Sequence, residues 1–499
     1  EPIGIRGHNA KLSDSSPEAA EEQLAFWREQ YEIFRSYERE DYQGQDRLSY
    51  DIFDFFMGNT LADADRWQLH NFPVNQMFGV QSSIPNFMAQ QHVIEDELGA
   101  EHYIARLNLM GTKFDQIIDG LVLRREAGIH PPAFTVDKVI DQIEGFIEPP
   151  AREHLLVTNF DDKIAGIPEA ELGESRRAEL RQQVVAAVDG VVYPAYRELH
   201  AYLADLSNEA TSNGGVWRLP NGDDFYQAAI TQHTTTTMTA DEIHAIGLAE
   251  VERIGAEMDA ILRAEGLTEG SIGERVRQIA ERPNQLYPDS DEGREQILAE
   301  YQSIIDEIDP AMANYFNLRP SVGVEVRRVP EFSEATAPGA YYQPPSLDGS
   351  RPGVFFVNLR DVSEIPRFGM RTLAYHEAVP GHHFQNAITQ QLDGLPMFRR
   401  MLPFTAYGEG WALYTEQLAW ELGFQDDPLD NLGRLQAEMF RAVRLVVDTG
   451  LHAKRWTRER AIDYMMEHTG MGEGEVTAEI ERYLVMPGQA LAYKVGMIK

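Results

Sequence analysis

Strand-forming sequence is confined to one short part of this chain, and this restricts the fold more than any other feature. Alternating valines at 322–326 are followed by two β-rich runs, 340–342 and 354–359, which lie between prolines and glycines. Elsewhere apolar residues recur at the spacing of helices. The sequence therefore predicts a mainly α-helical protein, with a small β-sheet just before the histidine-rich stretch that begins at His376.

The helical pattern divides into two parts. Ser16-Pro17 is a helix start in the first part, and Thr239 with Glu242 forms a capping box in the second. Between them, the turn-rich residues 212–223 contain Asn-Gly-Gly and Pro-Asn-Gly. We therefore expect an N-terminal helical lobe at 1–215 and a catalytic C-terminal lobe at 216–499, packed closely enough to be counted also as one domain.

Charge and the absence of cysteine limit the partners and ligands. Among 499 residues, 44 lysines and arginines stand against 80 aspartates and glutamates, a formal net charge of −36, which disfavours nucleic acid as a partner. Without cysteine, any metal must be held by His, Asp or Glu. No apolar run is long enough to span a bilayer, so we expect no integral membrane segment. Nothing in the sequence predicts an oligomeric state.

The stretch AYHEAVPGHHFQN at 374–386 is close to a helical zinc motif with one ligand displaced. Two histidines four positions apart share a helix face and can bind one zinc ion, with a glutamate after the first as the base. Here Pro380 stands four positions after His376. In an unbroken helix His382 would lie on the wrong face, and His383 on the correct face but nearly two turns further along.

The Pro-Gly step suggests how the ligand geometry is restored. Pro380 has no amide proton and crowds the preceding turn, at a cost of about 3 kcal/mol within a helix, and Gly381 adds backbone freedom. We therefore predict a bulge or interruption that returns His382 to the second ligand position, with His383 as the alternative. In the competing interpretation the helix ends before the proline and the histidines are ordinary surface groups. Three histidines and Glu377 within eight residues argue against it.

A third ligand must come from elsewhere, with a fourth position left for water. Glu409 opens a second helical stretch 27 residues after His382, and its flanking glycines allow a close backbone approach. Glu416 lies seven positions later on the same face, where it could orient one of the histidines. The alternative for either glutamate is a solvated surface position.

One Zn2+ per chain, held in this way, supports hydrolysis. Zinc lowers the pKa of bound water towards about 7, and Glu377 can take its proton. The developing oxyanion needs a donor, and the C-terminal region offers Tyr493 and His452 first, then Arg444. Their structural alternatives are a packed tyrosine, a satisfied core histidine and an arginine paired with Asp448.

Substrate-binding candidates lie in the strand segment and near the C-terminus. In zinc peptidases, an edge strand beside the metal-binding helix accepts the substrate as an added strand, which makes Tyr341 and Tyr342 candidates. A terminal carboxylate of the substrate could be captured by Arg444 or Lys494. The alternative for the strand segment is a purely structural hairpin.

Several motifs together resemble a bacterial family long labelled a domain of unknown function. They are Tyr-His-Glu-Ala-Val-Pro-Gly-His-His-Phe-Gln at 375–385, Glu-Gly-Trp-Ala-Leu-Tyr at 409–414 and Asp-Thr-Gly-Leu-His at 448–452. The residues at 232–236 and 240–244 are also typical of that family. The family is placed in the gluzincin peptidase clan, near thimet oligopeptidase-like and angiotensin-converting enzyme-like helical metallopeptidases. The resemblance covers nearly the whole chain and implies a two-lobed helical shell around a deep cleft, with zinc at its floor.

The resemblance also assigns ligands by position. The clan's His-Glu pair falls on His376 and Glu377, its Gly-His step on 381–382, and its downstream glutamate ligand on Glu409. The two residues inserted before the Gly-His step leave the second ligand open. The clan's late His and Tyr occur at spacings that this chain does not reproduce.

These features predict a zinc-dependent metallopeptidase that hydrolyses short peptides, because a deep helical cleft excludes folded proteins. Action as a carboxypeptidase or dipeptidyl carboxypeptidase is one form of this hypothesis, and endopeptidase action is left open. The alternatives are a zinc amidohydrolase acting on a non-peptide amide, and a catalytically inactive peptidase-like binding protein. We expect a periplasmic or exported protein, since many members of the resembled family carry export signals or lipoprotein anchors; a cytoplasmic location is the alternative.

Overall fold

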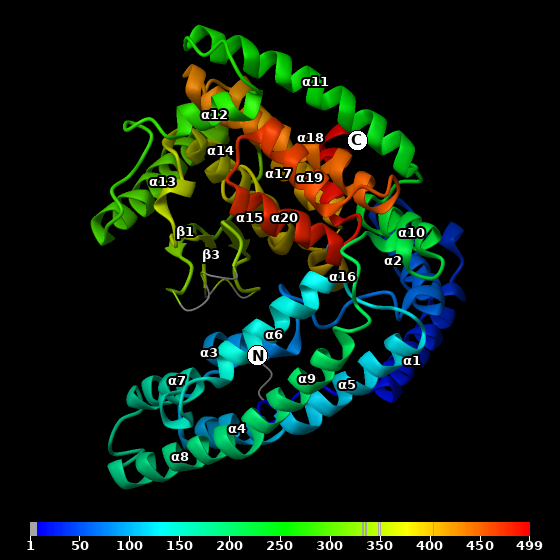
Figure 1. Cartoon of the computed structure of the whole chain (residues 1–499), viewed down its shortest axis with the longest axis vertical. Helices are drawn as coiled ribbons and strands as arrows, with labels where there is room; N and C mark the ends of the chain where they lie inside the picture. Colours follow the sequence, from blue (N-terminus) through cyan, green and yellow to red (C-terminus); the bar gives the residue numbers. More distant parts are fainter. Residues whose placement is uncertain (1–6, 332–333, 335–336, 348, 350, 403) are drawn as a thin grey trace. The chain divides into compact units, whose positions relative to one another are not determined.

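A computed structural model of the protein describes residues 7–331, 334, 337–347, 349, 351–402 and 404–499. The described residues are mainly helical, with one three-stranded sheet (Figure 1), which confirms the predicted fold class at this level. Two compact units divide after Asn213, close to the boundary expected after residue 215. None of the helices in the described ranges combines the length and apolar composition needed to cross a bilayer.

The first unit is helical. Ser16 caps its first helix by accepting a hydrogen bond from the Ala19 backbone, and Pro17 is the first helical residue, as the sequence predicts. A buried apolar core, with Tyr103, Phe114 and Tyr196 among its largest side chains, joins most of the later helices. The helices are α1 (Pro17–Arg35), α2 (Gly44–Trp67), α3 (Val80–Gln90), α4 (Glu97–Asn108), α5 (Met110–Glu126), α6 (Ala133–Ile147), α7 (Leu155–Ala165), α8 (Glu174–Ala187) and α9 (Tyr193–Leu206).

The second unit contains the sheet and the remaining helices. Thr239 and Glu242 form the expected capping box at the start of its longest early helix, α11. Its helices are α10 (Gly222–Thr234), α11 (Ala240–Ala264), α12 (Ile272–Ala280), α13 (Asp291–Ala311), α14 (Arg367–Glu377), α15 (His382–Gln391), α16 (Met397–Met401), α17 (Thr405–Glu421), α18 (Pro428–His452), α19 (Arg458–Thr469), α20 (Glu473–Val485) and α21 (Ala492–Ile498).

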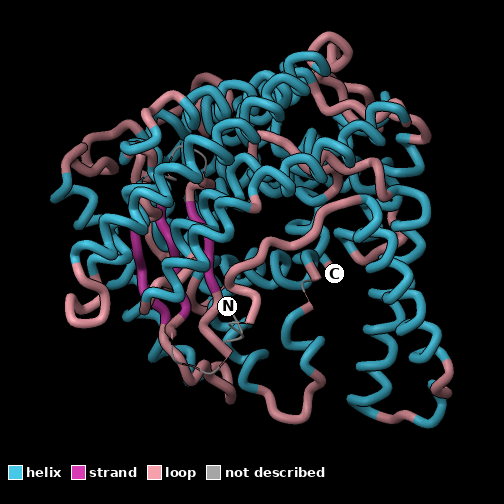
Figure 2. Tube along the Cα trace, turned by 90° about the horizontal axis from the view of Figure 1, so that it is seen from below, coloured by secondary structure: helices cyan, strands magenta, loops and turns pink. Residues whose placement is uncertain are grey.

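The sheet comprises β1 (Val324–Arg328), β2 (Ala340–Gln343) and β3 (Gly353–Val357), side by side in Figure 2. The apolar strand β3 is central, with β1 parallel to it and β2 antiparallel to it, so β2 is an edge strand. Phe355 of β3 packs against Tyr301 of α13 in a core that also includes Tyr375 of α14. The sheet is thereby fixed against the helix that ends in the His-Glu pair.

Helix α18 is the central helix of this unit. It packs against α11, α14 and α19, and its residues from 442 to 452 are all buried. A helix buried on every side is surrounded by neighbouring elements. The polar side chains of α18, such as Arg444 and His452, therefore have other side chains of the fold as neighbours instead of water.

Candidate metal centre

The helix that carries His376 is interrupted, as the Pro-Gly step predicts. Helix α14 ends at Glu377 and α15 begins at His382, with a cis peptide bond before Pro380 in the connection. A Cβ atom on Gly381 would lie 1.9 Å from the His376 carbonyl oxygen, so only glycine fits here without a backbone shift. This close return of the chain brings the start of α15 beside the end of α14.

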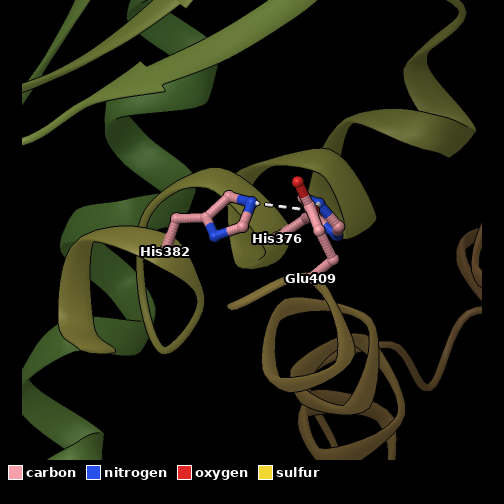
Figure 3. A group of neighbouring side chains, drawn as sticks. All are labelled: His376, His382 and Glu409. Atoms are coloured by element: carbon pink, nitrogen blue, oxygen red, sulfur yellow. Dashed lines mark ion pairs between the residues drawn. The ribbon is translucent and has the colours of Figure 1, made fainter. Parts of the chain in front are cut away.

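Three donor groups converge at the interruption, as Figure 3 shows. One donor atom each from His376, His382 and Glu409 lie within 4.8 Å of one another. Glu409 Oε2 is 3.3 Å from His382 Nε2 and 3.6 Å from His376 Nε2, and the two imidazole rings are inclined at 87°. The end of α14, the start of α15 and the first turns of α17 thus bring together the three expected ligands.

The electrostatics of this cluster suit a cation. Glu409 Oε2 is buried, and its contacts with the two imidazoles are ion pairs that do not meet the geometry of a hydrogen bond. Burial alone would raise the pKa of the Glu409 carboxyl, but the two imidazoles outweigh it and hold that pKa well below its ordinary value. Burial likewise lowers the pKa of His376, but Glu409 and Glu416 raise it to about 9. Two imidazoles and a carboxylate oxygen form a donor set that fits catalytic zinc.

Glu416 orients the first histidine. Its Oε1 lies 2.7 Å from His376 Nδ1, and both side chains are buried, with 2% and 3% of their surface exposed. A carboxylate can only accept, so Nδ1 carries a proton, and Nε2, which faces Glu409, is the nitrogen that could bind a metal ion after losing its own proton. Glu416 thus contacts one of the histidines from the same face of α17 as Glu409, as its position seven residues after Glu409 predicts.

His383 lies outside the cluster. Its Nε2 donates to the Val322 carbonyl at 3.0 Å, and its Nδ1 accepts a hydrogen bond from the Tyr342 hydroxyl at 3.0 Å. The ring is buried, and burial lowers its pKa to about 4. With both nitrogens engaged, His383 supports the sheet beside the site, and of the two histidines it is His382 that lies beside His376 and Glu409.

Glu377 ends α14, directly after the first ligand. Its side chain is buried and makes no hydrogen bond or ion pair with the described part of the chain. It lies close enough to Tyr301 to contribute to the raised pKa of that hydroxyl, although burial is the larger cause. A buried carboxylate without a partner is free to bind water or a polar group of a ligand.

Two C-terminal candidates have structural partners instead. His452 is fully buried: its Nδ1 accepts from the Val216 backbone at 3.1 Å, its Nε2 donates to the Tyr483 carbonyl at 3.0 Å, and burial lowers its pKa to about 4. Lys494 is also buried, with its Nζ 2.7 Å from Glu438 and 3.0 Å from Glu250. Both side chains are satisfied by the fold, which argues against a catalytic role for His452 and a carboxylate-binding role for Lys494.

Arg444 has partners other than the expected one. Its Nε donates to the Tyr483 hydroxyl at 2.8 Å and its Nη2 to Glu479 at 2.9 Å. Asp448, the expected partner, accepts instead from the Tyr226 hydroxyl and from the Gly488 backbone. Arg444 and Asp448 are four residues apart on one helix, which made an ion pair between them plausible. In the structure each is instead hydrogen-bonded to residues of other elements.

Tyr493 stands on α21, which packs against α17. A Cβ atom on Gly496, which lies one turn after Tyr493, would clash with the Ala406 carbonyl oxygen of α17. A Cβ atom on Gly410, the residue after Glu409, would likewise clash with the backbone of Gly496. Two glycines thus let the helices approach beside the ligand Glu409. The Tyr493 hydroxyl makes no hydrogen bond with a residue that the structure describes, so it remains a candidate donor.

The edge strand β2 lies beside the cluster. The Tyr342 ring is 6.4 Å from the His382 ring and nearly parallel to it, at 17°, whereas the Tyr341 ring stacks on Phe356. The backbone N–H of Asn358 donates to the Gly339 carbonyl, so these two residues form a hydrogen-bonded pair of the antiparallel ladder. Hydrogen-bonded and non-hydrogen-bonded pairs alternate along such a ladder, so Tyr342, opposite Phe355, belongs to a non-hydrogen-bonded pair. Its peptide N–H and C=O therefore point away from β3.

Two residues near the site were not predicted from the sequence. Trp411, two positions after Glu409, donates its Nε1–H to the Pro380 carbonyl at 2.9 Å and ties α17 to the interruption. Arg441 of α18 lies 3.9 Å from Glu416. Helical spacing from Arg444 places Arg441 on the same face, but only the folded neighbours show that it is near the cluster.

Comparisons with known proteins identify the family. The model of the family described as "Bacterial protein of unknown function (DUF885)" matches residues 2–499, and the chain belongs to that family. A crystal structure described as a "putative lipoprotein" from Colwellia psychrerythraea is similar, with 39% identity and a TM-score of 0.92 over 100% of this chain and 87% of that one. A "putative lipoprotein of unknown function" from Shewanella oneidensis shares the fold, with 17% identity and a TM-score of 0.73 over 99% of this chain and 88% of that one. No curated protein matches.

Proposed function

We propose that the protein is a zinc-dependent peptidase that hydrolyses short peptides. The observation that carries this proposal is the convergence of one donor atom each from His376, His382 and Glu409 within 4.8 Å. Three such ligands leave one position of a tetrahedral zinc ion for water or substrate. Bound zinc would polarise a substrate carbonyl and acidify a water molecule.

The surrounding side chains have separable tasks in this proposal. Glu416 holds the His376 ring in one tautomer and orientation through its 2.7 Å contact. Glu377 accepts the proton of the attacking water and passes it to the leaving nitrogen, since its buried carboxylate has no partner among the described residues. The unpartnered hydroxyl of Tyr493 can donate to the carbonyl oxygen as it becomes negative.

Strand β2 supports a peptide as the substrate. The outward-facing peptide groups of Ala340 and Tyr342 can pair with an extended peptide backbone, which would add to the sheet as a fourth strand. Tyr342 lies against His382, so a peptide paired there would run past the cluster. A non-peptide amide has no backbone for such pairing, and this feature favours a peptidase over an amidohydrolase.

A relation to the gluzincin clan and an exported location are part of the same proposal. The His-Glu pair on α14 and the glutamate ligand on α17 have the chain order that the clan requires. The similar structure from Colwellia psychrerythraea, 39% identical, is described as a "putative lipoprotein", which supports a periplasmic or membrane-anchored location for this chain. A catalytically inactive binding protein is the other candidate, although it gives no reason for a buried Glu377 carboxylate beside the cluster.

Metal analysis and peptide cleavage test the proposal together. The purified chain should contain one zinc per molecule, and His376→Ala or Glu409→Ala should remove it. A mixed peptide library, analysed by mass spectrometry, should show cleavage that requires zinc and stops in Glu377→Gln. A protein that binds no zinc would refute the metal centre, whereas a zinc-bound protein that cleaves no peptide would favour one of the alternatives.

A further inference from the structure

Arg441 is a largely buried cation whose carboxylate neighbour, Glu416, is in ion-pair contact but not hydrogen-bonded to it. Its side chain is 13% exposed, and its Nη2 lies 3.9 Å from Glu416 Oε1, beyond hydrogen-bond distance. Its Nη1 donates to the Ala437 carbonyl at 3.3 Å, and its Nε is buried without a partner in the described ranges. Glu416 Oε1 is engaged with His376 Nδ1, and Arg441 pairs with this carboxylate only at 3.9 Å. The guanidinium therefore keeps an Nε–H and an Nη2 that make no hydrogen bond with a described side chain.

The neighbours of Arg441 leave positive charge in excess. Arg444 is one helical turn further along α18 and is only 4% exposed, and its buried Nη1 also lacks a described partner. Arg482 of α20 is nearby and has an unpartnered Nε. Glu479 is the close carboxylate for both Arg444 and Arg482, at 2.9 and 3.7 Å. Burial, with neighbouring acidic groups, raises the pKa of Glu475 to about 7, so this carboxyl is only partly ionised near neutral pH.

Tyr493 connects this cationic cluster with the catalytic side of α17. Its ring centroid lies 4.3 Å from the Arg444 guanidinium and 6.0 Å from that of Arg441. Buried charges are normally paired, because an unpaired charge in the protein interior is costly. Three guanidinium groups share the carboxylates of Glu479 and Glu416, so an anion supplied by a ligand would add the missing negative charge.

We propose that Arg441 binds the terminal α-carboxylate of the peptide substrate, which makes the protein a carboxypeptidase or dipeptidyl carboxypeptidase. This inference rests on the proposed peptidase function. Guanidinium and carboxylate groups form paired, charge-assisted hydrogen bonds, and lysine cannot reproduce their geometry. Arg441 lies 3.9 Å from Glu416, which in turn lies 2.7 Å from His376, so the guanidinium is two side-chain contacts away from the cluster.

The reaction follows from this placement. One water molecule adds its hydroxyl to the acyl carbon as the C–N bond breaks, and its proton goes to the leaving amine. The leaving group is then the C-terminal amino acid or dipeptide, held by its carboxylate at Arg441. A peptide with an amidated C-terminus lacks the negative charge and should lose this contact.

Binding without turnover tests the subsite directly. Zinc-loaded Glu377→Gln protein is incubated with acetylated mixed-sequence tetrapeptides, one pool with free C-termini and one with amidated C-termini, and retained peptide is measured by mass spectrometry. We expect the free-acid pool to be retained at least about tenfold better. In the double variant Glu377→Gln/Arg441→Gln, the ratio of retained free-acid to retained amidated peptide should be close to one. The double variant Glu377→Gln/Arg441→Lys should give an intermediate ratio. Arg263→Gln is the control, because Arg263 lies on α11, is 57% exposed and pairs with Asp259.

Each outcome decides the proposal. A ratio near one in Glu377→Gln alone, or a ratio unchanged by Arg441→Gln, would overturn it. If Arg441→Gln loses zinc, Arg441→Lys decides, and an unchanged ratio there overturns the proposal as well. Hydrolysis by the protein with intact Glu377 reports on the proposed function separately. Equal cleavage of both pools refutes only the subsite, and selective binding without any cleavage refutes only the peptidase.

Discussion

Replacement of Glu416 by glutamine should weaken zinc binding although Glu416 is not a ligand. The carboxylate accepts the Nδ1–H of His376 at 2.7 Å, and both side chains are almost fully buried. The amide can still accept a hydrogen bond, but it lacks the negative charge that strengthens the contact and increases the basicity of Nε2. Loss of such a partner typically reduces metal affinity by about 10–100-fold, or about 1.4–2.8 kcal/mol. We expect the upper part of this range, because Glu416→Gln also leaves Arg441, 3.9 Å away, without a nearby negative charge.

The assay is competition for zinc against a chelator of known affinity, with peptide hydrolysis measured at saturating zinc. Glu421→Gln is the matched control, since Glu421 lies on the same helix, is exposed and contacts Gln417 instead of a histidine. Its zinc affinity should equal that of the unchanged protein. An affinity within twofold of that value for Glu416→Gln would refute the orienting role and require another source for the His376 geometry.

Three further predictions concern the base, the interruption and pH. Glu377→Gln should keep one zinc per chain and lose about 10²–10⁴-fold in kcat, measured on a cleaved library peptide. Gly381→Ala should lower zinc occupancy and cost about 1–3 kcal/mol or more in the free energy of unfolding, because its Cβ would meet the His376 carbonyl at 1.9 Å. Gly369→Ala is the control, since Gly369 lies in the preceding helix α14 with open space around it, and it should not lower the free energy of unfolding in a urea titration. The pKa of buried His452 is about 4, below its ordinary 6.5, so the unfolded chain binds the proton first and stability falls as pH drops below 6.5. In urea titrations at pH 7 and 5, His452→Gln should reduce this loss by about 2 kcal/mol, and an unchanged loss would contradict the assignment.

The features that the sequence predicted correctly depend on local chemistry. Proline and glycine after His376 interrupt a helix through backbone sterics alone, so the break between α14 and α15 could be placed before any tertiary contact was known. The seven-residue spacing from Glu409 to Glu416 likewise fixes a shared helix face. Helix caps at Ser16 and Thr239 belong to the same class, because each bond involves residues three positions apart.

The features that the sequence could not predict depend on partners distant in the chain. His452 and Lys494 have the chemistry of catalytic groups, but Val216 and Glu250, more than two hundred positions away, satisfy them inside the fold. The role of Arg441 shows the converse. Nothing in its local sequence distinguishes it from Arg444, but Arg444 is hydrogen-bonded to Glu479, whereas the carboxylate nearest to Arg441, that of Glu416, is 3.9 Å away.

The interruption also changes how the metal centre is held together. In an unbroken zinc helix, the hydrogen bonds of one helix fix the distance between the two histidines. Here the two histidines belong to different helices, and the connection between them is held by Trp411, whose indole donates to the Pro380 carbonyl. Trp411 stands two positions after Glu409, so one turn of α17 positions the third ligand and also the segment that places the second. The ligand geometry therefore depends on the docking of α17 against α14 and α15, and formation of the site should be coupled to packing of the whole second unit.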